Sequence, residues 1–460
     1  MLDKNIAQQV LEVAMETGGD FAEIFFEDRF NNSISLRSNI TESIVSSRVH
    51  GAGIRVYLNT EAFYVYTNDT SLKGLLDCAK KAAAIINESK KHPVAKLQAL
   101  HKYAAWDIKL KPSQVEAKQK IDMLKRASKV ALAVDEISQV NAYYTDAMQS
   151  VWIANTDGLF VTETRPYTRT AIVAVASDGK ENQTSVVSPG ASSGFEFYDT
   201  LDLEALSKKA ANTAVTMLHA PVCPAGYMPV VIDNAFGGVI FHEACGHSLE
   251  ATSVAKGFSE FSNKLGQQIA SEKVTAIDDG TIPFEWGSTQ IDDEGTPTSR
   301  LVLIENGILK NYMIDRLNNR IMKMSLTGSA RRESYKYPPT SRMRNTYIAA
   351  GNDDADEIIS TMGNGLYAKS MGGGSVDPAT GEFNFNVLEA YLVKDGKIAH
   401  PVRGASLIGK GSEILTKIDM VSKDMKMAQG MCGSISGSVP VNVGQALIRV
   451  SGLTVGGYAE

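Results

Sequence analysis

One short segment, His242-Glu243-Ala244-Cys245-Gly246-His247, constrains the local fold of this 460-residue chain more than any other. In an α-helix each residue turns by about 100°, so two histidines five residues apart point about 140° away from each other. A regular α-helix therefore cannot direct both imidazoles at one metal ion. A single π-turn can, because its wider turn brings residues five apart onto one face, and Gly246 gives the backbone the freedom to form it. We predict a π-turn in a metal-bearing helix.

The pair of histidines is unusual in this chain, which has only seven histidines. Two isolated histidines are commonly structural residues on a buried helix, but here they share one turn with a glutamate beside the first. This grouping favours a metal site, with His242 and His247 as ligands and Glu243 as a general base that accepts a proton from water. The other histidines are scattered and are expected to be structural: His50, His92, His101, His219 and His400.

A catalytic zinc usually has three protein ligands and one position open to water, so a further ligand is required. The candidates are Glu250, Cys245, Cys223 and Cys432. Glu250 and Cys245 lie so near the histidines in sequence that the short helix would have to wrap around the ion. Cys432 lies in the glycine-rich segment 430–434, expected to be a loop, from which a thiol can approach an ion without steric conflict. On chemical grounds we prefer Cys432 to Cys223.

The pattern of apolar residues predicts an α+β protein. It comprises N-terminal helix-and-strand units followed by a large strand-rich C-terminal domain, with mostly antiparallel sheets and the metal-bearing helix. The expected domains are 1–105, 106–222 and 223–460. Helices are predicted over 5–17, 72–89, 113–134 (with a Ser113/Glu116 capping box) and 203–218. Strands are predicted over 21–27, 33–38, 53–66, 151–154, 159–163, 170–176, 301–305, 308–314, 388–394 and 397–402, several joined by Asn-Gly or Asp-Gly turns.

Composition and charge narrow the classes of function. The net charge is −6 and no long block of Lys or Arg occurs, so direct nucleic-acid binding is not expected. No apolar run approaches the roughly 18 residues of a membrane span, and acidic residues interrupt the first twenty positions, unlike a signal peptide. Four cysteines are too few for a disulfide scaffold of this length. We expect a soluble, cytoplasmic protein that makes no membrane contact.

Five segments carry a resemblance to a known family: 242–250, 291–298, 303–310, 328–335 and 439–445. They resemble the TldD family of the TldD/PmbA metalloproteases, whose members have also been named modulators of DNA gyrase. The resemblance implies one zinc per catalytic subunit, held by His242, His247 and Cys432, with Glu243 as the base. It also implies peptide or unfolded-protein substrates. The working unit would be a homodimer, or a heterodimer with a metal-free paralogue of the TldE/PmbA type.

Two other functions remain open on the sequence alone. The chain could be a non-catalytic regulatory or binding protein with a structural metal site acting on a protein partner, although such a site has no use for Glu243. It could instead be a cysteine hydrolase that uses Cys432 or Cys245.

Three further features bear on a hydrolytic mechanism. Candidate donors to the oxyanion are Tyr335, Arg331, Arg332 and Arg342. The acidic run 292–294 is expected to form a turn with solvated or capping carboxylates rather than a hard-cation site. The glycines at 372–374 are expected to form a tight turn, the alternative being an exposed sheet edge to which a peptide could add as a strand.

Overall fold

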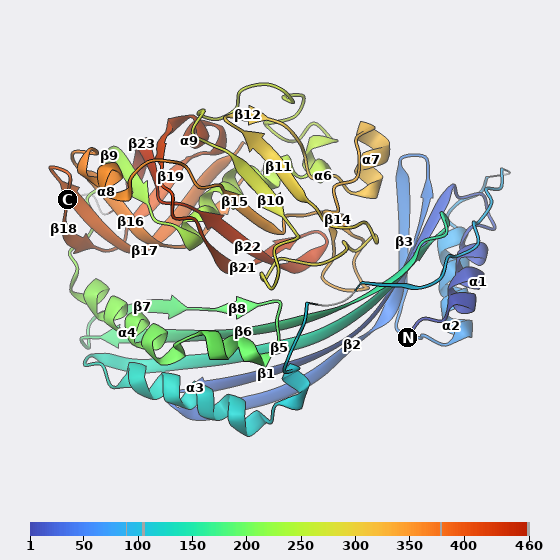
Figure 1. Ribbon diagram of the computed structural model, residues 1–460, viewed down its shortest axis with the longest axis horizontal. Coiled ribbons are helices and arrows are strands. Elements are labelled where there is room, and N and C mark those ends of the chain that lie inside the picture. The colour runs from blue at the N-terminus through green and yellow to red at the C-terminus, as the bar shows by residue number, and fades with distance from the viewer. Residues whose placement is uncertain (89, 104–105, 378–379, 458–460) are drawn as a thin grey trace.

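The computed structural model describes residues 1–460 except 89, 104–105, 378–379 and 458–460. A long curved sheet forms one layer, with helices along its outer face and at one end, and a compact C-terminal unit lies over its other face (Figure 1). The predicted α+β class, with mostly antiparallel sheets and a large strand-rich C-terminal region, is confirmed. Within the described residues, no helix is both long and apolar enough to cross a bilayer.

The long sheet combines strands from both predicted N-terminal units in the order β3-β2-β1-β5-β6-β4, and β7 and β8 also pair with β6. Its strands are β1 (Phe21–Arg37), β2 (Ile40–Leu58), β3 (Glu61–Thr67), β4 (His101–Tyr103), β5 (Ile137–Asn155), β6 (Phe160–Ser177), β7 (Asn182–Val187) and β8 (Gly190–Ala191). The two units therefore share one framework. Their division into separate domains stays a prediction, and its first boundary, at residue 105, falls outside the described residues.

The strands of this sheet are much longer than predicted. The expected strands 21–27 and 33–38 form one continuous strand, β1. The expected strands 151–154 and 159–163 form the tip of the β5–β6 hairpin, and the expected strand 170–176 is a later part of β6. Polar residues between the two predicted strands pair with neighbouring strands: Arg48 donates to Asp28 at 2.7 Å, and Asn32 to Asp146 at 2.7 Å. Polar residues can thus continue a strand when the facing strands supply their partners.

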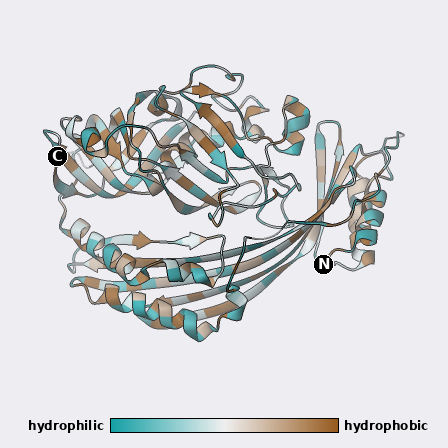
Figure 2. Ribbon diagram, viewed as in Figure 1, coloured by the Kyte–Doolittle hydropathy of each residue, from teal (hydrophilic) through white to brown (hydrophobic). Residues whose placement is uncertain are grey.

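Helices cover the outer face of this sheet in two places. They are α1 (Lys4–Ala14), α2 (Leu72–Ala83), α3 (Ala117–Leu132) and α4 (Leu203–His219), with short 3₁₀ helices η1 (Pro112–Gln114) and η2 (Phe195–Thr200). Hydrophobic and hydrophilic stretches alternate along α3 and α4, as an amphipathic helix requires (Figure 2).

Two of these helices differ from the prediction. Helix α2 ends at Ala83, short of the expected end at residue 89, which itself lies outside the described residues. Helix α3 begins later than expected, because η1 occupies the predicted first turn, and Glu116 is its N-cap without a side-chain hydrogen bond. The Ser113/Glu116 capping box is therefore wrong.

The C-terminal unit contains two larger sheets, ordered β12-β11-β10-β15-β22-β21 and β16-β9-β23-β19-β17-β18; β16 also pairs with β17, and β20 with β23. The strands are β9 (Gly226–Ile232), β10 (Ala276–Asp279), β11 (Arg300–Glu305), β12 (Ile308–Leu309), β13 (Ala330–Arg331), β14 (Thr340–Ser341), β15 (Asn345–Ile348), β16 (Gly365–Val376), β17 (Glu382–Lys394), β18 (Lys397–Val402), β19 (Ser406–Lys410), β20 (Ile418–Val421), β21 (Lys426–Ser434), β22 (Gly437–Gln445) and β23 (Ile448–Gly456). Its helices include α7 (Arg316–Met322), α8 (Ala355–Ser360) and α9 (Gly411–Lys417).

The predicted Asn-Gly and Asp-Gly turns of this unit are confirmed at Asn306–Gly307 and Asp395–Gly396, where both residues have positive φ as type I′ turns require. The predicted tight turn at 372–374 is wrong. These glycines belong to β16, which pairs with β17 through irregular register and leaves Gly373 open.

A buried ionic junction fastens the long sheet to the C-terminal unit. The acidic run 292–294 was predicted to form a turn with solvated or capping carboxylates, but it is almost fully buried. Glu294 pairs with Arg55 of β2, and Asp293 Oδ1 accepts from Arg165 Nη1 of β6 at 2.6 Å. Asp292 accepts backbone N–H groups from its own turn, so the predicted capping role is confirmed for this residue. Asp293 and Glu294 thus hold the two layers together.

Candidate metal centre

The metal-motif segment follows β9 and changes helix type along its length. A 3₁₀ turn (η3, Ala235–Gly238) leads into α5 (Val239–Phe241), a π-turn (η4, His242–Gly246), a further 3₁₀ turn (η5, His247–Leu249) and α6 (Ala251–Val254). The predicted π-turn between the two histidines is confirmed.

Gly246 serves a different purpose from the one expected. Its φ of −57° and ψ of −48° are ordinary helical values that any residue can adopt. A Cβ at this position would instead overlap the sulfur of Met343, which is fully buried against the π-turn. The glycine is therefore favoured by close packing against Met343 rather than by backbone freedom.

The π-turn brings the two histidines to the thiol of Cys432. One donor atom from each of His242, His247 and Cys432 lies within 4.8 Å of the other two. Cys432 Sγ is 3.2 Å from His247 Nε2, and the two imidazole rings are nearly perpendicular, with centroids 5.1 Å apart. His242 Nδ1 is buried and has no hydrogen-bond partner within the part of the chain that the structure describes. Such a group of converging donors suits a metal ion.

Cys432 reaches this position from a strand and not from the predicted loop. It lies on β21, paired with Val439 of β22, and is 3% exposed. Its backbone carbonyl accepts a hydrogen bond from Arg342 Nη2 at 2.5 Å. The strand and this bond fix the cysteine backbone more firmly than a loop would.

Two carboxylates flank His247. Glu250 Oε2 lies 3.2 Å from Nδ1, and Glu243 Oε2 lies 3.6 Å from Nε2. The Glu250 side chain is 6% exposed, whereas that of Glu243 is 29% exposed and so faces the accessible side of the centre. A carboxylate on Nδ1 orients the ring and leaves Nε2 available to an ion.

The charges of the centre favour the metal-binding form of the thiol. Burial alone would raise the pKa of Cys432, but the neighbouring His242 and His247 outweigh it and lower that pKa to about 3. Burial likewise opposes protonation of His247, but Glu250 and Cys432 raise its pKa well above the usual range. The thiolate is the form of cysteine that binds metals, and a set of two imidazoles and one thiolate fits zinc.

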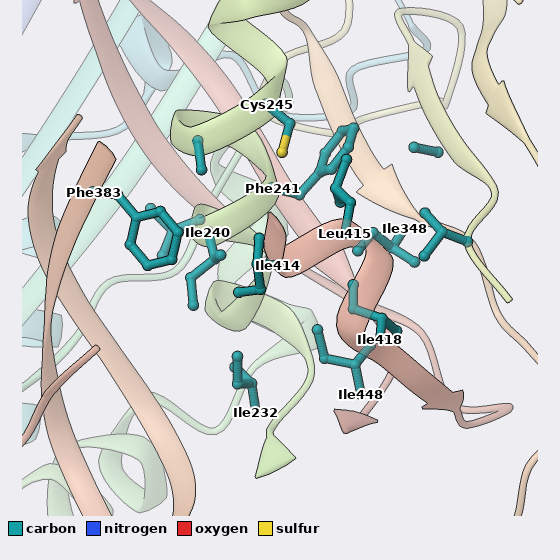
Figure 3. Close-up of a cluster of buried hydrophobic side chains, with 14 of the residues drawn as sticks. Ile232, Ile240, Phe241, Cys245, Ile348, Phe383, Ile414, Leu415, Ile418 and Ile448 are labelled. Atoms are coloured by element: carbon teal, nitrogen blue, oxygen red, sulfur yellow. The ribbon is translucent and has the colours of Figure 1, made fainter. Parts of the chain in front are cut away.

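Two of the other proposed ligands, Cys245 and Cys223, lie elsewhere. Cys245 points into the hydrophobic core beside Phe241 and Leu415, and burial raises the pKa of its thiol well above the usual value (Figure 3). Cys223 is also buried, with its sulfur 3.5 Å from the carbonyl of Pro224.

Among the four oxyanion candidates, only Arg342 contacts the centre, but its guanidinium is already bonded to backbone carbonyls and Ser436. Glu250 was predicted as a candidate ligand and Arg342 as a candidate oxyanion donor, but their supporting roles were not predicted. Glu250 lies one turn beyond His247, so helical spacing could have suggested it, whereas nothing in the sequence connects Arg342 with Cys432.

Family models account for nearly the whole chain. The PmbA/TldA metallopeptidase C-terminal domain matches residues 225–457, the central domain 110–218 and domain 1 residues 22–86. The chain belongs to the TldD/PmbA family of metallopeptidases. The C-terminal match contains all four residues predicted for the site, and the N-terminal matches together cover the long sheet except β4 and the first residue of β1.

Relatives and solved structures agree with this family. The chain is 36% identical to a metalloprotease TldD homologue of Buchnera aphidicola (95% of this chain, 93% of the relative) and 35% identical to one of Haemophilus influenzae (97% and 95%). A Saccharolobus solfataricus relative named a zinc metalloprotease TldD homologue is 28% identical (97% and 99%).

Two solved structures share the fold. A Thermotoga maritima protein that bears the name of a DNA gyrase modulator superimposes with a TM-score of 0.80 at 22% identity (98% of this chain, 99% of that one). TldE of Thermococcus kodakarensis gives 0.76 at 18% identity (98% and 99%).

Proposed function

We propose that this protein is a zinc-dependent peptidase that cleaves unfolded or extended peptides, with His242, His247 and Cys432 as zinc ligands and Glu243 as general base. The observation that carries the proposal is the convergence of three donor atoms within 4.8 Å, with the Glu243 carboxylate 3.6 Å from one of the imidazoles. A zinc metalloprotease among the relatives supports the choice of metal.

When bound, zinc supplies Lewis acidity that polarises a carbonyl and lowers the pKa of water toward about 7. The protein supplies the rest. Glu243, partly exposed and beside His247, takes the proton of the attacking water and returns it to the leaving amine. Glu250 holds His247 in the tautomer with its proton on Nδ1, and Arg342 fixes the backbone of Cys432, so the ligands are positioned before substrate arrives.

The proposed working unit is a dimer, either of two copies of this chain or with a metal-free paralogue. The fold shared with a protein named TldE supports the second arrangement. Size-exclusion chromatography with light scattering, on the chain alone and after mixing with the paralogue, distinguishes the two.

The Glu243→Gln substitution tests the proposed function. It removes the base but none of the ligands, so hydrolysis of an unfolded protein, followed by mass spectrometry, should fall by about 100-fold or more while the zinc content is unchanged. Glu272→Gln, on the surface, is the matched control and should hydrolyse like the wild type.

Two results would contradict the proposal. Wild-type rates in folded, zinc-loaded Glu243→Gln would exclude this residue as the base. Hydrolysis that resists a chelator but is abolished by a thiol alkylator would support a cysteine hydrolase instead.

A further inference from the structure

A second site is suggested by a cavity between the two layers. It has a volume of about 340 Å³ and lies between the long sheet and the β21–β22 hairpin. Figure 1 shows this hairpin on the side of the C-terminal unit that faces the sheet. Met431, the residue before Cys432, lines the cavity. Val439, which pairs with Cys432 across the hairpin, also lines it, so the cavity adjoins the strands that carry the metal-binding cysteine.

Two arginines in the cavity wall have no carboxylate partner. Arg331 is 5% exposed, and its hydrogen bond is from Nη1 to the carbonyl of Met343 at 2.8 Å. Arg169 donates to Ser188 Oγ and to the carbonyl of Gln429. Neither forms an ion pair with any residue that the structure describes. Burial lowers the pKa of both guanidinium groups, and for Arg331 the nearby charge of Asp293 opposes this effect without outweighing it.

The carboxylates of the same wall are hydrogen-bonded to other groups and form no ion pair with these two arginines. Each accepts hydrogen bonds from groups other than Arg169 and Arg331. Asp293 Oδ1 accepts from Arg165 Nη1 (2.6 Å) and Asp293 Oδ2 from the backbone N–H of Arg332 (2.7 Å). Asp146 Oδ2 accepts from Lys120 Nζ (2.6 Å), and Glu333 Oε2 accepts from the backbone N–H of Ser438 (2.8 Å). A buried positive charge without a partner is unfavourable, so the cavity is suited to an anion.

Two aromatic rings also line the cavity. Trp286 and Tyr167 meet edge to face with centroids 5.4 Å apart, and the Arg169 guanidinium lies 5.5 Å from the Trp286 ring. The planar guanidinium group matches the two oxygens of a carboxylate, and the rings offer an apolar surface next to it. This combination fits an anion attached to an apolar group better than a free inorganic ion.

We propose that this cavity binds a carboxylate of the peptide substrate at Arg331 and Arg169, with the adjacent apolar side chain against Trp286 and Tyr167. The inference rests on the proposed peptidase function, since it takes the ligand to be a peptide. The carboxylate is either the C-terminus of the peptide or an acidic side chain.

Binding of short peptides, measured by calorimetry, tests the proposal without requiring hydrolysis. The full chain carrying Glu243→Gln is titrated with acetyl-Ala-Ala-Phe as the free acid, with its C-terminal amide, and with the amide of acetyl-Ala-Glu-Phe. The free acid should bind about tenfold or more tightly than the simple amide, as expected for a charge-assisted pair. Adding Arg331→Gln should abolish that difference.

Matched variants keep the test decisive. If Arg331→Gln fails to fold, Arg169→Gln, which alters a less buried arginine, should reduce the preference in the same way. Arg126→Gln changes an exposed arginine far from the cavity in sequence and should leave the preference unchanged. Equal binding of the glutamate-containing amide and the free acid would assign the site to acidic side chains, which also supports the proposal.

Two results would overturn it: equal affinity for the free acid and both amides, or a preference for acid that survives both cavity substitutions. Failure of the proposed function would differ, because peptides would then bind with the expected preference while the wild-type, zinc-loaded protein left them uncleaved.

Discussion

The carboxylate of Glu250 provides a quantitative test of how the metal centre is supported. It is 6% exposed and lies 3.2 Å from His247 Nδ1. Loss of such a partner typically weakens metal binding by about 10- to 100-fold, or about 1.4–2.7 kcal/mol. Glu250→Gln keeps an acceptor for the Nδ1 proton, so we expect a loss near the lower limit. Glu250→Ala leaves that buried donor without a partner and should approach the upper limit.

Zinc affinity is measured by competition with a chromophoric chelator, and thermal unfolding checks that each variant is folded. Glu260→Gln is the control, because Glu260 is a similarly buried carboxylate of the same unit, 10% exposed, whose ion pair is with Lys410. It should bind zinc like the wild type. Wild-type zinc affinity in both folded Glu250 variants would refute the proposed role of this carboxylate.

Two substitutions test the packing and the junction between the layers. Gly246→Ala places a methyl group against Met343 and should lower the free energy of unfolding by about 1–3 kcal/mol and weaken zinc binding. The control Gly373→Ala adds its methyl group in open space and should do neither. A wild-type melting temperature for Gly246→Ala would contradict the packing described. Arg55→Met leaves Glu294 buried without its cation and should lower the free energy of unfolding by about 3–5 kcal/mol. The change is measured by urea denaturation. A loss under about 1 kcal/mol, as for an exposed pair, would mean that the junction is not stabilising.

The local geometry of the metal motif could be predicted from the sequence because it depends on helical spacing alone. Histidines five residues apart can share a face only if the helix widens, and the π-turn between His242 and His247 is observed. The same reasoning gave the wrong purpose for Gly246, because its contact with Met343 joins residues about a hundred positions apart. Contacts of that separation leave no periodic pattern in the sequence.

Longer-range features were missed for the same reason. The polar stretch within β1 resembled a loop, since the partners that make it a strand, Arg48 and Asp146, come from other strands. The acidic run 292–294 resembled a solvated turn, since Arg55 and Arg165 lie far away in sequence. The preference for a glycine-flanked thiol did select Cys432, which the structure brings beside both histidines, although from a strand.

The most direct test of the account is the zinc content of the purified protein and of Cys432→Ala, determined by elemental analysis on samples shown to be folded by circular dichroism. The account predicts about one zinc per wild-type chain and a sharp loss in the variant, because two imidazoles alone do not form a three-ligand site. A full complement of zinc in folded Cys432→Ala would contradict it.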